Sequence, residues 1–273
     1  MVTLTCPVCG GNLLRKERTL RCEKGHCYDL AKQNYVNLLL RNQSSGKRHG
    51  DDKRMVAARQ AFLDAGYYAP LRDELCRMAL KYGGETVKLL DVGCGEGYYT
   101  SAVRSALENA GKCCDALGVD ISKTALMAAN KRDKALELAV ASISALPVPD
   151  GEIDILLSVF APTDDGEFLR AVKPGGIFIK AAPLEDHLFG LKRAVYDAPY
   201  RNGPLTYAPE GFTLLERSEI CGSIRVSPNA QIEALFMMTP YYYKTGAADQ
   251  AKLKALDELT TEYAFGVLVF RKD

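Results

Sequence analysis

The sequence lacks an apolar run long enough to cross a membrane, because no stretch approaches about 18 consecutive apolar residues. Internal repeats are also missing. The segment Met1–Cys6 contains no apolar core of the kind found in secretory signal peptides. These absences argue against a helical membrane protein and predict a cytoplasmic location.

The nine cysteines are an odd number, spread over a chain of 273 residues. Without a secretory signal, we expect a reducing compartment, in which thiols bind metals or pack in the core. The length is sufficient for one large domain, or for one domain joined to a small module.

The net charge of +1 conceals an asymmetry along the chain. Residues 1–60 carry 12 lysines and arginines against 5 aspartates and glutamates, and the remainder carries 23 against 29. A basic N-terminal region on an acidic body suggests a polyanionic partner for that region. A solvated basic face without a partner is the alternative, and charge alone does not separate the two.

Two short motifs in the first 26 residues have the spacing of metal ligands. Cys6 and Cys9 are separated by two residues, and Cys22 and His26 follow after a gap of 12 with three residues between them. Four such ligands in two tight turns predict a closed, structural zinc site. Buried structural cysteines are the alternative, and Cys27 competes with His26 for the fourth position. Basic residues around this site predict an RNA or DNA contact.

A glycine-rich loop lies between an apolar segment, residues 87–92, and a helical pattern that begins at Tyr98. The loop carries Gly93, Gly95 and Gly97, which allow positive φ and let a ligand approach the backbone N–H groups. This strand–turn–helix layout is typical of a nucleotide-like ligand site. A tight turn without a ligand is the alternative reading of the three glycines.

Two further positions fit such a ligand. Asp120 ends the next apolar segment, where a carboxylate commonly holds a ribose diol. Its alternative role is a helix cap shared with Ser122. Ser142 follows the third apolar segment, where an adenine could be held.

Alternating apolar and helical segments predict an α/β fold with a parallel sheet covered by helices on both faces. The expected strands are residues 87–92, 115–119, 137–141, 153–159 and 176–181, then fragments at 212–216 and 224–226, and a last strand at 265–270. The expected helices are residues 53–65, 71–82, 98–109, 122–133, 164–172, 228–238 and 249–259. We expect residues 183–210 to form an irregular covering segment.

The loop spacing separates two classes of enzyme that share this layout. It is Gly-x-Gly-x-Gly rather than the Gly-x-Gly-x-x-Gly of a pyrophosphate site, so the ligand need not carry a pyrophosphate. Two further apolar strands near the end of the sequence suit a seven-stranded methyltransferase sheet. We therefore predict a Rossmann-like, seven-stranded class I domain dependent on S-adenosylmethionine, over residues 53–273. A zinc module, residues 1–40, and a linker, residues 41–52, precede it.

The whole chain resembles the RlmA family of bacterial 23S ribosomal RNA guanine-N1 methyltransferases, which includes a branch associated with macrolide resistance in Gram-positive bacteria. The resemblance is specific because one chain carries both the zinc module and the methyltransferase loop; either feature alone would not be. The matching stretches are Cys6–Cys9 with Cys22 and His26, Tyr28–Lys32, Tyr35–Leu39, Gly50–Asp51, Ala58–Gly66, Tyr68–Arg72, Leu90–Thr100, Val172–Gly176 and Met238–Pro240.

The resemblance implies roles for single residues. It favours His26 over Cys27 as the fourth zinc ligand, and it matches Tyr68, Gly95, Glu96 and His187 to positions that contact S-adenosylmethionine. By themselves, Tyr68 would be a packing aromatic and His187 an ordinary loop histidine. The implied substrate is a guanosine in a hairpin loop of 23S ribosomal RNA, and the oligomeric state stays open between a monomer and a homodimer.

Methylation at N1 requires the loss of the N1 proton, so a base or a donor to O6 would help. Asp51, Asp52 and Asp154 are candidates by residue type only, and none is assigned. The segment Ser158–Pro162 carries neither an Asn-Pro-Pro-Tyr motif nor a Pro-Cys nucleophile, which disfavours exocyclic amine and pyrimidine carbon-5 methylation.

An unstacked guanine needs a partner for its ring. Phe160, Tyr98 and Tyr99 are stacking candidates or, equally, core residues. Two other functions remain open: a small-molecule methyltransferase braced by its zinc module, and a zinc-containing RNA-binding protein without catalysis.

Overall fold

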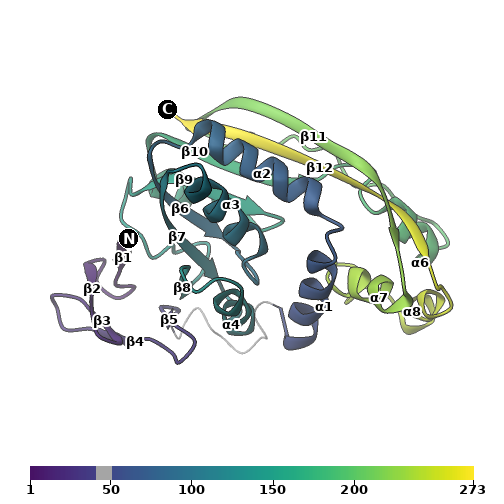
Figure 1. Ribbon diagram of the computed structural model, residues 1–273, viewed down its shortest axis with the longest axis horizontal. Helices are drawn as coiled ribbons and strands as arrows, with labels where there is room; N and C mark the ends of the chain where they lie inside the picture. The colour runs from purple at the N-terminus through teal and green to yellow at the C-terminus, as the bar shows by residue number, and fades with distance from the viewer. Residues whose placement is uncertain (41–50) are drawn as a thin grey trace.

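An eight-stranded sheet runs through the centre of the computed structural model, which describes residues 1–40 and 51–273 (Figure 1). The strands of this sheet are β5 (Tyr35–Asn37), β6 (Thr86–Val92), β7 (Cys113–Asp120), β8 (Glu137–Val140), β9 (Ile153–Val159), β10 (Val172–Pro183), β11 (Phe212–Val226) and β12 (Leu259–Lys272). Their order is β11-β12-β10-β9-β6-β7-β8-β5. β12 runs antiparallel to both of its neighbours, β10 and β11, and the other described pairs in this sheet are parallel. The predicted linker, residues 41–52, lies outside the described residues except for Asp51 and Asp52.

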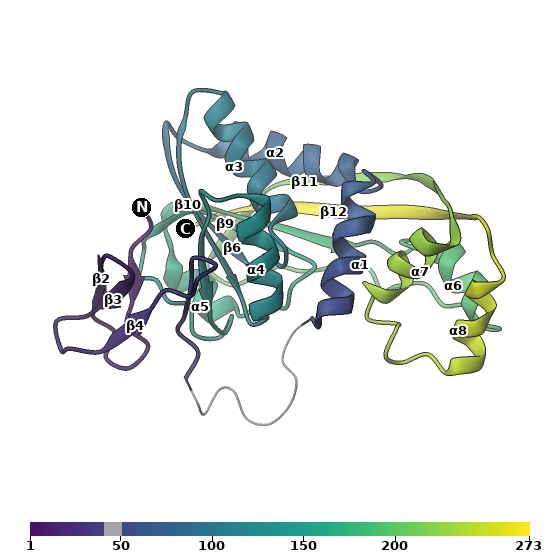
Figure 2. The same ribbon diagram turned by 60° about the horizontal axis from the view of Figure 1, so that its bottom comes forward.

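Helices cover both faces of the sheet, as the alternation of segments predicts (Figure 2). They are α1 (Lys53–Asp64), α2 (Ala69–Tyr82), α3 (Tyr98–Asn109), α4 (Lys123–Arg132), α5 (Asp165–Ala171), α6 (Phe189–Val195), α7 (Asn229–Met237) and α8 (Ala247–Lys254). Local sequence sets where several of them begin: the side chains of Asp52, Ser122 and Asp164 accept hydrogen bonds from the first free N–H groups of α1, α4 and α5. Within the described part of the chain, no helix is both long and apolar enough to cross a membrane.

The N-terminal module contains a second, four-stranded sheet, and it packs on the larger domain (Figure 1). Its strands are β1 (Leu4–Thr5), β2 (Asn12–Lys16), β3 (Thr19–Arg21) and β4 (Cys27–Asp29). Side chains that alternate along the central strands separate two apolar clusters: Leu89 joins the cluster beneath α2 and α3, whereas Leu90 joins the one shared with α5 and the module. The module therefore buries its apolar residues against the larger domain.

The last part of the module joins the large sheet as an edge strand. Residues of β5 pair in parallel with β8, and the backbone N–H of Leu38 donates to the carbonyl of Val140. The seven predicted methyltransferase strands are confirmed, and β5 adds an eighth that the sequence pattern did not indicate. Three residues are too short to show a strand period.

Three expectations for the later part of the chain were wrong. The fragments at 212–216 and 224–226 are one continuous strand, β11, whose edge position leaves many polar side chains exposed and hides its strand period. The expected irregular segment contains α6, which begins without a capping side chain. The helix expected at 249–259 ends at Lys254, because the last strand begins at Leu259 rather than at residue 265.

Candidate functional site

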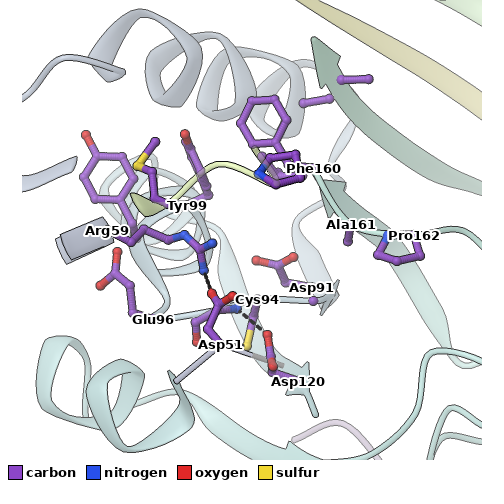
Figure 3. Close-up of a pocket in the computed structure, with 18 of the residues that line it drawn as sticks. Asp51, Arg59, Asp91, Cys94, Glu96, Tyr99, Asp120, Phe160, Ala161 and Pro162 are labelled. Atoms are coloured by element: carbon purple, nitrogen blue, oxygen red, sulfur yellow. Dashed lines mark hydrogen bonds and ion pairs between the residues drawn. The ribbon is translucent and has the colours of Figure 1, made fainter. Parts of the chain in front are cut away.

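A cavity of about 880 Å³ opens at the carboxyl ends of β6, β7, β9 and β10 (Figure 3). Seven of the eight predicted cofactor residues line it: Tyr68, Gly93, Gly95, Glu96, Asp120, Ser142 and His187. Its position matches the crevice at the switch in strand order, where open α/β sheets bind their ligands. Figure 3 shows Phe160 and Pro162 across the pocket from Glu96 and Asp51.

The glycine loop brings backbone close to this cavity. Gly93, Gly95 and Gly97 all have positive φ, of 75°, 55° and 78°. A Cβ on Gly93 would lie 2.6 Å from the Cβ of Ala161, so no larger residue fits there. Gly97 is not among the lining residues: it begins α3 and packs closely against Ala129 of α4.

Asp120 holds the loop in place. Its carboxylate accepts hydrogen bonds from the N–H of Gly95, at 2.9 Å, and from that of Ser122, at 2.7 Å. Each oxygen keeps a second lone pair, so the carboxylate can still accept from a ligand hydroxyl. Burial raises the pKa of Asp120 above its usual value. Ser122 itself caps α4 and Asp120 accepts from its N–H, so the cap role is confirmed, whereas the contact of Asp120 with a ribose diol stays a prediction.

Two further carboxyl groups in the cavity have pKa values raised to about 7, in both cases chiefly by burial. Asp91 accepts a hydrogen bond from the hydroxyl of Thr100 at 2.5 Å, and Glu96 accepts one from Arg132 at 2.7 Å. Each keeps one buried oxygen without a partner in the described part of the protein. Unpartnered carboxylate oxygens suit a cationic, hydrogen-bonding ligand.

Tyr68 and His187 meet in an aromatic group at the other side of the cavity. The ring nitrogen Nδ1 of His187 accepts from the N–H of Ala264, so Nε2 carries the proton and donates to the Tyr68 hydroxyl oxygen, 3.3 Å away. Burial lowers the pKa of His187 to about 3, so the ring is neutral. The Tyr68 hydroxyl hydrogen is then free to donate to another acceptor.

The cavity also contains residues that the sequence did not single out as ligand contacts. These are Arg59 of α1, which forms an ion pair with Asp51, the loop residue Cys94, and Lys180 of β10. Lys180 is the only charged residue between Ile177 and Ala182, and a lone lysine inside an apolar strand was the available signal. All three stacking candidates, Tyr98, Tyr99 and Phe160, line the cavity as well.

The three acid candidates for a base separate in space. Asp51 lines the cavity, whereas Asp52 caps α1. Asp154 lies outside the lining, where it accepts from the N–H of Lys88 and pairs with Lys173.

The four predicted zinc ligands converge in the module. The ligand atoms of Cys6, Cys9, Cys22 and His26 all lie within 4.8 Å of one another. The two thiols of Cys9 and Cys22 are 3.7 Å apart, and His26 Nδ1 is 3.3 Å from the sulfur of Cys22. A tetrahedral ion with zinc–sulfur bonds of about 2.3 Å places two thiolates about 3.8 Å apart, so the donor set fits zinc. Cys27 is outside this group: its thiol contacts the carbonyl of Gly25.

Comparisons with known proteins match both parts of the chain. A zinc-ribbon family described as RlmA, N-terminal, matches residues 4–45, and a methyltransferase domain family matches residues 89–176. The chain is 39% identical to 23S rRNA (guanine(748)-N(1))-methyltransferase of Streptomyces fradiae over 70% of its own length and 67% of that protein.

Two further proteins are similar. YxjB of Bacillus subtilis (strain 168), provisionally named a 23S rRNA (guanine-N(1)-)-methyltransferase, is 34% identical over 76% of this chain and 74% of its own. The crystal structure of YcgJ protein from Bacillus subtilis matches with a TM-score of 0.51 and 15% identity, over 73% of this chain and 98% of that one. The second likeness concerns the fold alone.

Proposed function

This chain belongs to the family of 23S ribosomal RNA (guanine-N1)-methyltransferases, and we propose that it transfers a methyl group from S-adenosylmethionine to N1 of a guanosine in a hairpin loop of 23S ribosomal RNA. The observation that carries the proposal is the union of a ligand cavity at the sheet switch point with a basic zinc ribbon on the same core. Either part alone would fit a small-molecule enzyme or a binding protein.

We assign the cofactor to the loops that follow β6, β7 and β8, with Tyr68 and His187 closing the site from the other side of the cavity. S-adenosylmethionine supplies a methyl group already activated by a sulfonium charge. The proposed contacts are Tyr68, Gly93, Gly95, Glu96, Gly97, Asp120, Ser142 and His187, with Gly97 acting through the shape of the loop. The carboxyl groups of Asp91, Glu96 and Asp120 favour a cation, and the neutral ring of His187 adds no repulsion.

We assign the grip on RNA to the module, residues 1–40, with zinc held by Cys6, Cys9, Cys22 and His26. The side chains of Arg15, Arg18, Arg21 and Lys24 lie on its exposed surface, where phosphates could reach them. Residues 41–52 then act as a linker and residues 53–273 as the catalytic domain. Ribosomal RNA as substrate implies a cytoplasmic location. A homodimer stays a prediction, which sedimentation velocity tests.

Primer extension tests the proposal directly. A methyl group at N1 blocks base pairing, so reverse transcription of 23S ribosomal RNA should stop one nucleotide before a single guanosine in cells that contain the protein, and should read through in cells that lack it. Purified protein with labelled cofactor should label the hairpin that contains this guanosine. Labelling at another atom or in no ribosomal fragment would reject the proposal.

A further inference from the structure

Lys180 is a cation without an anionic partner inside the cavity. Its residue is 9% exposed, and among the residues that the structure describes no carboxylate forms an ion pair with it. Its ammonium lies 4.7 Å from the centre of the Tyr207 ring. The carboxylate of Asp165, whose charge acts on Lys180, instead accepts from the Tyr207 hydroxyl. Burial lowers the pKa of Lys180, which reflects the free-energy cost of an unpaired charge.

Phe160 lies beside this lysine and projects into the same cavity. Its N–H donates to the carbonyl of Ala181, the residue after Lys180. The side chain is 43% exposed although it is large and apolar. Its φ is 55°, a strained value for a bulky residue, of the kind that clusters at ligand sites. One part of its ring packs on His187, with centroids 6.2 Å apart and planes inclined by 20°.

The two residues lie on the sheet beyond the strands that carry the proposed cofactor contacts, and His187, which contacts Tyr68, adjoins Phe160 where the two halves of the cavity meet. The proposed cofactor contacts on the sheet follow β6, β7 and β8, whereas Phe160 follows β9 and Lys180 lies on β10. In the sheet order, β9 and β10 lie on the opposite side of β6 from β7 and β8. A second ligand in this half would have its reacting atom near the switch point between β6 and β9.

We propose that Phe160 and Lys180 form the subsite for the acceptor base, in which the guanine stacks on Phe160 and directs O6 toward the Lys180 ammonium. This inference rests on the proposed function. The N1 proton passes to a water molecule, and the electron pair it leaves places negative charge on O6, which the ammonium stabilises. N1 then forms its bond to the methyl carbon as the sulfur–methyl bond breaks and its electron pair stays on sulfur. Lys180 remains protonated throughout.

Lysine variants test the electrostatic half of the subsite in single-turnover methylation of the RNA hairpin. Lys180→Met should lower the rate by about 100-fold or more, because a preorganised donor to a developing oxyanion is lost. Its affinity for S-adenosylmethionine, measured by calorimetry, should stay within about 3-fold of wild type. A normal cofactor affinity would show that the variant has lost transition-state stabilisation and is not unfolded. Lys180→Arg keeps the cation and should recover part of the rate.

Lys112→Met is the matched control. Lys112 is a half-buried lysine that donates to the carbonyls of Gly83 and Gly84, at the opposite end of the sheet from the cavity. The Lys112→Met variant should methylate the RNA hairpin at the wild-type rate. An unchanged rate in Lys180→Met would overturn the subsite, and so would a loss of cofactor affinity in proportion to the loss of rate.

Phenylalanine variants test the stacking half. Phe160→Leu keeps an apolar side chain and removes the ring face, so the apparent affinity for the hairpin should fall by about 10-fold, within the range for one stacked base. Phe160→Tyr should behave as wild type. If Phe160→Leu equals wild type, the ring only fills space and the stacking role is rejected. A wild-type protein that methylates no guanosine N1 would instead reject the proposed function itself.

Discussion

The zinc module and the methyltransferase domain are stabilised by different means. The fully buried residues of the domain core beneath α2 and α3 include none from the module, although Tyr35 and Leu39 of the module pack against this core. The module has a few short strands, four converging ligands and a small set of apolar residues that pack on the other face of the domain. A fold with so little core depends on its metal. From this difference we expect the cofactor cavity to stay intact when the module loses its metal.

Removal of the metal should give the largest effect on this comparison. Cys22→Ser, or chelation of the full chain, should unfold the module and lower affinity for the RNA hairpin by about 10-fold or more, since its phosphate contacts are lost. Calorimetry with S-adenosylmethionine should give nearly unchanged binding. Loss of both affinities together would show that the two regions fold as one unit.

A change in the cofactor half should have the opposite pattern. Asp120→Ala removes the acceptor of the Gly95 N–H and should weaken cofactor binding by about 10- to 100-fold, the value of a lost charge-assisted hydrogen bond. Zinc content should not change. Asp154→Ala is the matched control, because this acid lies outside the cavity, and normal cofactor affinity is expected there. Loss of zinc in Asp120→Ala would contradict the separation.

Asp91→Asn should separate stability from cofactor binding within the domain. The pKa of Asp91 is about 7 in the folded protein and near 3.8 when unfolded, so the folded state binds the extra proton between these values. Stability therefore falls as pH rises through this window. The variant cannot ionise at this position, so its free energy of unfolding should exceed that of wild type by about 2–4 kcal/mol at pH 8 and should differ little at pH 4.

Thermal unfolding at the two pH values measures the difference for Asp91→Asn. The affinity for S-adenosylmethionine should fall in the same variant, because a carboxylate in the cavity becomes neutral. A gain in stability that is equal at pH 4 and pH 8 would mean that the charge of Asp91 is not its cause.

The smallest effect is expected at the contact between the two regions. Glu152 accepts from the N–H of Thr3 in the module, at 3.0 Å, and pairs with Lys88 in the domain, at 2.7 Å. Glu152→Ala should cost about 1 kcal/mol of docking free energy. Faster amide exchange near Thr3, with normal zinc content and cofactor affinity, is the expected result. Unchanged exchange there would show that Glu152 does not contribute to holding the module on the domain.

Features set by local sequence were predictable, and features set by tertiary contacts were not. The glycine loop and the spacing of the zinc ligands from Cys6 to His26 are each set by a few neighbouring residues. In the structure the loop residues Gly93 and Gly95 line the cavity, and the four ligand side chains converge on one another. Asp120 also follows from its place at a strand end. In contrast, β5 becomes a strand only because β8 offers a free edge, and no period of its own indicates it.

The acceptor half of the cavity was hidden from the sequence for the same reason. Lys180 interrupts an apolar strand, and its importance comes from the absence, among the described residues, of an ion pair between its ammonium and a carboxylate. Phe160 could equally have been a core residue, and only its backbone turn exposes the ring. Charge balance and exposure depend on segments far apart in the chain, which single-sequence patterns do not contain.

The position of β12 has a consequence for synthesis of the protein. It lies between β10 and β11 in the sheet, yet it is made after both, and β11 pairs with no other strand in the described chain. While translation has reached only residue 226, β11 has no place to attach, and Phe265, which packs against Tyr68 and His187, does not yet exist. The cavity is therefore completed late in synthesis, so a nascent chain cannot modify RNA before its last strand leaves the ribosome.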